Sequence, residues 1–125
     1  MEFGMQVKNC RTLLLSEIDR LAEAKLDFAF ETTLSGTAHA SRLRRLKDAG
    51  YEITIIFISL DSALLAKRRV AFRVRQGGHT VPPQDIVRRF ERGLRNFREI
   101  YRPIADSWVI YNNSDEYCRL EESGP

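Results

Sequence analysis

The residues best suited to chemistry in this chain are arginines beside a glycine turn. Arg69 and Arg73 stand four residues apart, Arg75 follows them, and Gly77-Gly78-His79-Thr80 then breaks the helical pattern. Side chains four apart share one face of a helix, where two guanidinium groups repel each other by roughly a few tenths of a kcal/mol. An anion held between them would relieve that repulsion. The pattern predicts a lid that closes over an anion, although two solvated helices with soluble surfaces would have the same composition.

Charge is unevenly distributed along the chain. The segment from Lys67 to Arg102 holds eleven of the 20 Lys and Arg residues but only three of the 17 Asp and Glu residues. The formal net charge of +3 therefore conceals a basic segment attached to an acidic remainder. Such a segment attracts phosphate-bearing partners. A nucleic-acid partner is disfavoured, because Phe72, Phe90 and Phe97 are expected in the core rather than free to stack on bases.

A carboxylate and two hydroxyl groups follow the first apolar run. Glu31, Thr32 and Thr33 lie at the end of the segment 27–32, DFAFET, whose consecutive apolar residues predict a strand covered on both faces. In open α/β sheets, binding residues gather at the carboxyl ends of strands. These side chains could therefore bind the hydroxyl groups of a substrate. A turn that caps the next helix would use the same residue types.

Two amides follow the last apolar run. The segment 107–111, SWVIY, predicts a strand, and Asn112 and Asn113 come directly after it. At the carboxyl edge of a sheet these amides could read a base or a ribose. A plain turn is an equally common use of the same residues.

The elements that must position these residues alternate along the chain. Apolar residues three or four apart predict helices, and β-branched runs predict strands. The order α-β-α-β-α-α-β is typical of a parallel sheet covered by helices. The helices are expected at 9–25, 37–49, 62–76 and 83–101, and the strands at 27–32, 51–60 and 107–111.

One glycine inside the last predicted helix points to packing. Gly93 lies in the middle of the apolar stripe of residues 83–101. Glycine costs a helix interior about 1 kcal/mol relative to alanine. That cost indicates that another part of the chain packs closely against the helix at this position.

Length and composition indicate one cytoplasmic domain. A chain of 125 residues with 43% hydrophobic residues can bury a core without disulfides. Its apolar runs are shorter than the about 18 residues of a membrane-spanning helix, and its N-terminus lacks the pattern of a signal peptide. Cys10 and Cys118 match no metal or redox spacing, which fits a reducing compartment. We expect a single domain over 1–125, ending in a flexible polar tail at 119–125.

Four stretches, taken in order, resemble the zeta-toxin-like P-loop kinases: FAFETTLSG, AGYEITIIFISL, RVRQGGHTVPPQDIVRRFERGLRNF and IADSWVIYNNS. The Gly-Gly-His-x-Val-Pro segment, with the Arg-Arg and Gly-Leu-x-Asn that follow it, is the most specific part. The resemblance runs from about Arg11 to about Tyr117 and places a kinase-like core over residues 5–118. It implies an α/β fold with an incomplete three-layer parallel sheet of the P-loop kinase type, about three strands and helices on both faces.

This resemblance implies phosphoryl transfer from ATP, with Mg²⁺, to a small hydroxyl-bearing molecule, which in the zeta toxins proper is a UDP-linked amino sugar. It places Arg69 and Arg73 among the catalytic lid arginines that contact phosphate. It places Glu31, Thr32 and Thr33 in the substrate-side motif. An antitoxin is an implied partner. The residues that it assigns to the nucleotide are Arg75, His79, Asn112 and Asn113.

The sequence departs from this family at the phosphate site. It contains no G-x-x-x-x-G-K-[ST], and none of its four lysines follows a glycine-rich loop. The family's first βα unit and the aspartate expected to be its catalytic base have no counterpart. We therefore expect no metal site, no tight binding of ATP and Mg²⁺ by this chain, and no kinase activity from it alone. The alternative is a non-catalytic nucleotide- or phosphate-binding module.

The missing unit has a consequence for the sheet. Its strand would lie between those predicted at 27–32 and 51–60, and buried backbone groups there cannot stay unpaired. The gap could be closed by direct pairing of the two strands. It could also be filled by an N-terminal strand over Phe3–Val7, or by a second chain in a homodimer that completes the sheet.

Overall fold

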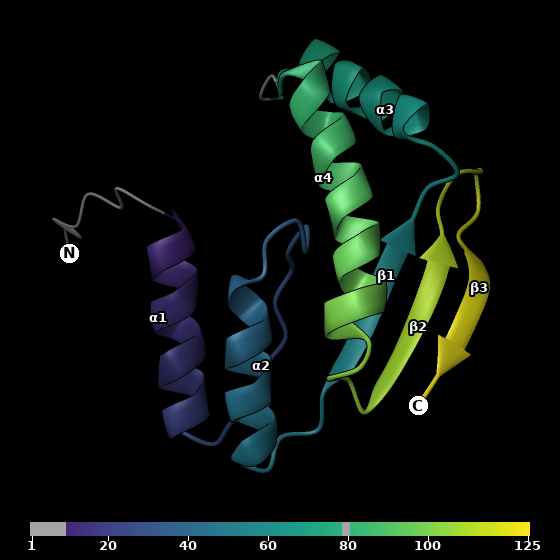
Figure 1. Cartoon of the computed structure of the whole chain (residues 1–125). Helices are drawn as coiled ribbons and strands as arrows, with labels where there is room; N and C mark the ends of the chain where they lie inside the picture. The colour runs from purple at the N-terminus through teal and green to yellow at the C-terminus, as the bar shows by residue number, and fades with distance from the viewer. Residues whose placement is uncertain (1–9, 79–80) are drawn as a thin grey trace, which may run out of the picture. The chain divides into compact units, whose positions relative to one another are not determined.

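The computed structural model of the chain describes residues 10–78 and 81–125 (Figure 1). It forms two units that divide between Glu31 and Thr32. The first unit contains helix α1 (Cys10–Glu23), followed by a segment at 26–31 without regular secondary structure. The prediction of a strand at 27–32 is therefore wrong. A strand needs a neighbour to accept its ladder of hydrogen bonds, and all three strands of the sheet lie in the second unit.

The second unit is built on a three-stranded mixed sheet with the order β1-β2-β3 (Figure 1). Strand β1 (Thr54–Ser59) pairs in parallel with β2 (Ser107–Asn112), and β2 pairs antiparallel with β3 (Arg119–Gly124). The predicted α/β class with about three strands is confirmed. The flexible tail predicted at 119–125 is wrong, because these residues form β3. An edge strand needs only backbone hydrogen bonds from its neighbour, so a polar sequence can form it.

Two hydrogen bonds between Ile53 and Asp106 set the register in which β1 and β2 begin. The Asp106 backbone N–H donates to the Ile53 carbonyl over 2.8 Å, and the Ile53 N–H donates to Asp106 Oδ2 over 2.7 Å. Lys47 Nζ lies 3.3 Å from Asp106 Oδ1 and donates to the Ile104 carbonyl over 2.9 Å. The Ile53 N–H, and then Lys47, hold the pKa of Asp106 below its usual value.

Helix α2 (Ala38–Asp48) packs as its sequence predicts. Its buried residues are Ala40, Leu43 and Leu46, which lie three residues apart on one side of the helix. This spacing gives the apolar stripe of a surface helix. The apolar spacing that predicted a helix at 37–49 is therefore also the spacing of its buried residues.

Helix α4 (Pro83–Asn96) continues into a wider π-helical turn, η1 (Phe97–Tyr101). Within η1 the Arg102 N–H donates to the Phe97 carbonyl over 2.7 Å, five residues back. Phe97 is fully buried, and its ring stacks on Phe57 of β1 at 4.7 Å and meets Trp108 of β2 edge-on at 6.0 Å. These contacts form the core on one face of the sheet.

The other face of β1 is open within this unit. Ile56 is 62% exposed and Ile58 is 51% exposed. The expected helical cover of both faces is therefore incomplete among the described residues of the second unit.

Helix α3 (Ala63–Arg75) lies against α4 but buries none of its own residues (Figure 1). Ser62 caps it, with Oγ accepting from the Leu65 N–H over 3.2 Å. At its other end Gly77 adopts a φ of +91°, a conformation that favours glycine. Leu64 and Phe72, expected to face inward, are exposed because the described residues around α3 leave that side of it uncovered. Each helix in residues 10–78 and 81–125 is too short or too polar to cross a membrane.

Candidate phosphate-binding site

An open concavity lies on one face of α3. Its volume is about 420 Å³, and the residues that line it are Arg68, Arg69, Phe72 and Arg73. These positions are one, four and five residues apart, so a single helical face carries all of them. Three of the four lining residues are arginines, whose charge attracts anions, while the surface of the concavity itself is mostly apolar.

One guanidinium group ties this face to the end of the sheet. Arg69 Nη2 donates to the backbone carbonyl of Asn113, in the loop after β2. The Asn113 N–H in turn donates to the carbonyl of Ser59, at the end of β1, over 2.9 Å. The structure therefore brings two predicted site residues, Arg69 and Asn113, to the carboxyl edge of the parallel strands, where ligands bind in open α/β sheets. Arg73, also predicted, lies on the same face of α3 as Arg69.

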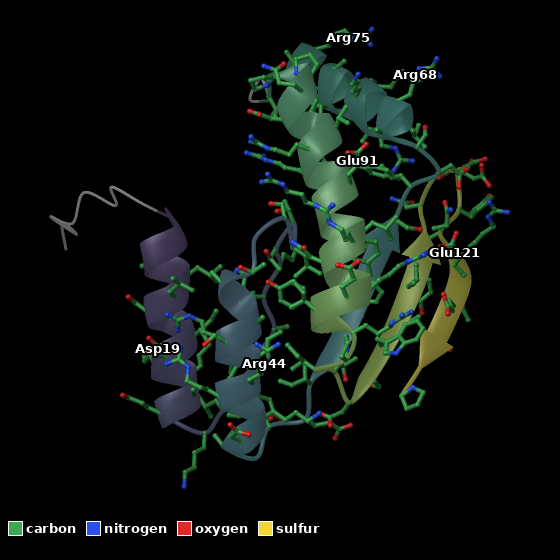
Figure 2. The ribbon with its side chains drawn as sticks, in the orientation of Figure 1. Asp19, Arg44, Arg68, Arg75, Glu91 and Glu121 are labelled. Carbon is green, nitrogen blue, oxygen red and sulfur yellow. The ribbon has the colours of Figure 1, made fainter. Side chains whose placement is uncertain are left out.

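Arg75, another predicted nucleotide contact, lies elsewhere. Arg75 is exposed at the far end of α3, outside the residues that line the concavity, and Figure 2 shows its side chain projecting beyond the helix. His79 falls outside the described residues. Arg68 takes part instead, although the sequence analysis did not select it. Its position, four residues before Phe72, is the signal that could have identified it.

Asn112 uses its amide to hold the loop after β2. It is 6% exposed, and Nδ2 donates to Asp61 Oδ1 over 2.7 Å and to Glu121 Oε1 over 3.1 Å. Its Oδ1 accepts from the Ser114 N–H over 2.9 Å. A buried amide with these partners stabilises the sheet edge. Its predicted contact with a nucleotide stays a prediction, and it would require this network to open.

The predicted hydroxyl-binding residues lie on an exposed loop. Glu31 ends the first unit, while Thr32 and Thr33 begin the second, and all three side chains are exposed. Thr32 Oγ1 accepts from the Leu34 N–H over 3.3 Å, and Thr33 Oγ1 lies 2.9 Å from Ser35 Oγ. Each hydroxyl stabilises the local turn. Their role in substrate binding stays a prediction.

Helix α4 holds this loop by its backbone. A Cβ placed on Gly93 would lie 2.8 Å from the Thr33 carbonyl oxygen, so the close packing predicted at Gly93 is confirmed. Three residues further, buried Asn96 donates from Nδ2 to the Leu34 carbonyl over 2.8 Å. Leu34 itself has a φ of +55°, which is uncommon for a residue with a side chain. The helix thus fixes a strained segment of the loop.

A third contact fixes the end of the loop. The hydroxyl of Tyr101, which is fully buried, donates to the Gly36 carbonyl over 2.7 Å. Burial raises the pKa of this phenol, because the charged form would lose its hydration. Sequence reasoning missed Asn96 and Tyr101 as positioning residues, since an amide and a phenol within an apolar stripe resemble ordinary core residues.

Comparison with known proteins identifies the family. The sequence profile of the zeta toxin family matches residues 5–123. The chain belongs to the zeta toxin family. A protein of Haemophilus influenzae described only as uncharacterized is 30% identical over 63 residues, which is 50% of this chain and 44% of that protein. No solved structure matches the chain.

The described residues do not fit a magnesium site of their own. Within 10–78 and 81–125, no three His, Cys, Asp or Glu side chains come together as a metal site. The sequence also lacks the P-loop hydroxyl that holds Mg²⁺ in P-loop enzymes. We therefore assign no step of the reaction to a metal ion held by this chain.

Proposed function

We propose that the arginine face of α3 binds the phosphates of ATP. This binding would serve the ATP-dependent phosphorylation of a small hydroxyl-bearing molecule, such as a UDP-linked amino sugar. The observation that carries the proposal is the concavity lined by Arg68, Arg69 and Arg73 beside the loop after β2. Guanidinium groups donate several charge-assisted hydrogen bonds to phosphate oxygens. Three of them on one helical face suit a polyphosphate better than a single carboxylate.

The attachment of α3 suits a lid. No residue of α3 is buried, and the turn that follows it contains Gly77 in a conformation that favours glycine. Elements with few buried contacts open at low free-energy cost. Phosphate bound between α3 and the sheet edge would draw α3 towards Asn113, to which Arg69 is already hydrogen-bonded.

The loop at Thr32 and Thr33 is the proposed acceptor side. Its exposed hydroxyl groups and the neighbouring Glu31 could pair with the hydroxyl groups of a sugar. Three contacts with α4 and η1 hold the loop in place, so its geometry would be set before substrate arrives.

This chain alone is proposed not to complete the transfer. Phosphoryl transfer depends on positioning and charge stabilisation, and the phosphate-binding loop and its lysine supply much of both. The sequence lacks that motif. The same observation favours the second candidate, a non-catalytic nucleotide- or phosphate-binding module. A coupled assay for ADP release tests both candidates, because Mg²⁺-dependent turnover of ATP by the pure chain would contradict both this expectation and the module.

Binding is tested by calorimetry and thermal shift with ATP and with tripolyphosphate. Ligand at about 100 times Kd should add about 2.7 kcal/mol to the free energy of unfolding. Arg73→Ala should weaken both ligands by about tenfold, since a hydrogen bond to a charged group contributes about 1.5–3 kcal/mol. Arg73 is preferred to Arg69, whose hydrogen bond to Asn113 also stabilises the fold.

Arg44→Ala is the matched control. Arg44 is an exposed arginine on α2, remote in sequence from the lid (Figure 2). It should leave the affinity for both ligands unchanged. Equal weakening by Arg44→Ala and Arg73→Ala would show general charge attraction and contradict the site.

A partner chain is proposed at β1. Among the described residues this strand ends the sheet and pairs with β2 on one side only, and Ile56 and Ile58 within it are exposed. A second copy that continues the sheet, or an antitoxin, would cover these groups. Sedimentation should show a dimer that Ile56→Lys dissociates. A monomer at every concentration would contradict the homodimer.

A further inference from the structure

We infer that Phe72 is the base-stacking residue of the α3 concavity. A mononucleotide would place its base on the Phe72 ring and its phosphates on Arg68 and Arg73. This inference rests on the proposed function and adds to it. The proposed function needs only that phosphates bind, whereas stacking makes the site prefer a nucleotide over a bare polyphosphate.

The exposure of the Phe72 ring is the first observation. Phe72, in the last turn of α3, is 59% exposed, and it lines the concavity together with three arginines. Burial of a phenyl ring that is exposed to water is favourable. The arginine side chains around it leave more than half of the ring accessible. A flat apolar ligand could therefore cover it.

Charge and size select the class of ligand. The concavity combines one aromatic ring with three cationic groups, which match the two halves of a nucleotide: a flat base and a chain of phosphates. The concavity is open to solvent and has a volume of about 420 Å³, so it would cover one face of a base rather than enclose the ligand. An extended nucleic-acid strand would instead need several aromatic platforms along a basic groove, and the lining residues of this concavity include a single ring.

The position of the concavity agrees with this assignment. Phe72 lies three residues after Arg69 on the same helical face, and Arg69 reaches the Asn113 carbonyl at the carboxyl edge of the sheet. Open α/β folds bind their ligands at that edge. Closure of α3 would thus bring the ring and its base to the sheet edge together with the phosphates.

The experiment compares ATP with tripolyphosphate on the full chain, by calorimetry without added metal. The wild type should bind ATP more tightly, because base–aromatic stacking contributes about 5- to 150-fold in affinity. Phe72→Ala should remove this advantage and leave the affinity for tripolyphosphate unchanged. Phe72→Trp should restore it and add a tryptophan emission that ATP quenches. The melting temperature of Phe72→Ala should match the wild type, since the ring is largely exposed.

Leu64→Ala is the matched control. Leu64 is also an exposed apolar residue of α3, 56% accessible, but it does not line the concavity. It should leave both affinities unchanged. Equal binding of ATP and tripolyphosphate by the wild type would overturn the inference and leave the proposed function intact, whereas binding of neither ligand would refute the proposed function itself. Tighter binding of an oligonucleotide than of ATP, with a steep dependence on salt, would show a strand-binding surface and also overturn the inference.

Discussion

Substitution of Gly93 by alanine tests how α4 holds the hydroxyl-bearing loop. The added Cβ would lie 2.8 Å from the Thr33 carbonyl oxygen, closer than such atoms approach in proteins. The oxygen cannot retreat easily, because Asn96 and Tyr101 bond the next carbonyls of the loop, at Leu34 and Gly36. The strain must therefore be relieved by a shift of the helix or the loop.

The size of the effect is a difference between two opposing terms. Overpacking of this kind costs about 1–3 kcal/mol, and the fixed position of the carbonyl places Gly93→Ala in the upper part of that range. Alanine also favours the helix over glycine by about 1 kcal/mol. The net expectation is that the free energy of unfolding falls by about 1–2 kcal/mol.

The assay is urea unfolding followed by circular dichroism, with the free energy of unfolding taken from the linear extrapolation. Gly36→Ala is the control, because it lies in the same loop and nothing stands within 4 Å of its Cβ position. It should change stability by less than about 0.5 kcal/mol. If Gly93→Ala instead raised stability by about 1 kcal/mol, as at an open helical position, the close approach of Thr33 would be refuted.

The remaining predictions concern one buried amide and one carboxylate. Asn96→Ala should lower the free energy of unfolding by about 1–3 kcal/mol, because the buried Leu34 carbonyl loses its donor; unchanged urea unfolding would show that this bond contributes nothing. The pKa of Asp106 is lowered in the folded chain, chiefly by the Ile53 N–H and then by Lys47. The stability that Asp106 contributes is therefore fully present above the pKa of this residue in the unfolded chain, and it is lost as pH falls through the pKa in the folded chain. Asp106→Asn should therefore flatten the acid side of the stability profile measured by thermal unfolding between pH 6 and about pH 2; a profile as steep as that of the wild type would contradict this.

Much of the second unit could be predicted from local patterns. The periodic apolar residues of α2, the β-branched run of β1 and the Ser62 cap each depend on neighbours close in sequence. The packing at Gly93 was also predictable, because a costly glycine in a helix implies a close neighbour even when that neighbour is unknown.

The errors arose where distant parts of the chain decide the outcome. The run at 27–32 has the composition of a buried strand but is not part of the sheet, while β3 has a polar sequence and forms because β2 offers it a free edge. The arginines of the site were visible as a charge cluster. The exposure of Phe72 was not, because which face of α3 is covered depends on what packs against it.

The wide turn of η1 determines the direction in which the side chains that follow it point, and one of these side chains holds the hydroxyl-bearing loop. An i to i+5 bond between the Phe97 carbonyl and the Arg102 N–H accommodates one more residue than an α-helical turn would. With this turn in place, Phe97 faces the sheet and the Tyr101 hydroxyl reaches the Gly36 carbonyl. Loss of one residue from the turn would rotate all that follows by about 100° relative to α4. The hydroxyl-bearing loop would then keep its contacts with Gly93 and Asn96 but lose the one with Tyr101. The number of residues in this turn, as well as their identity, therefore determines where an acceptor could sit.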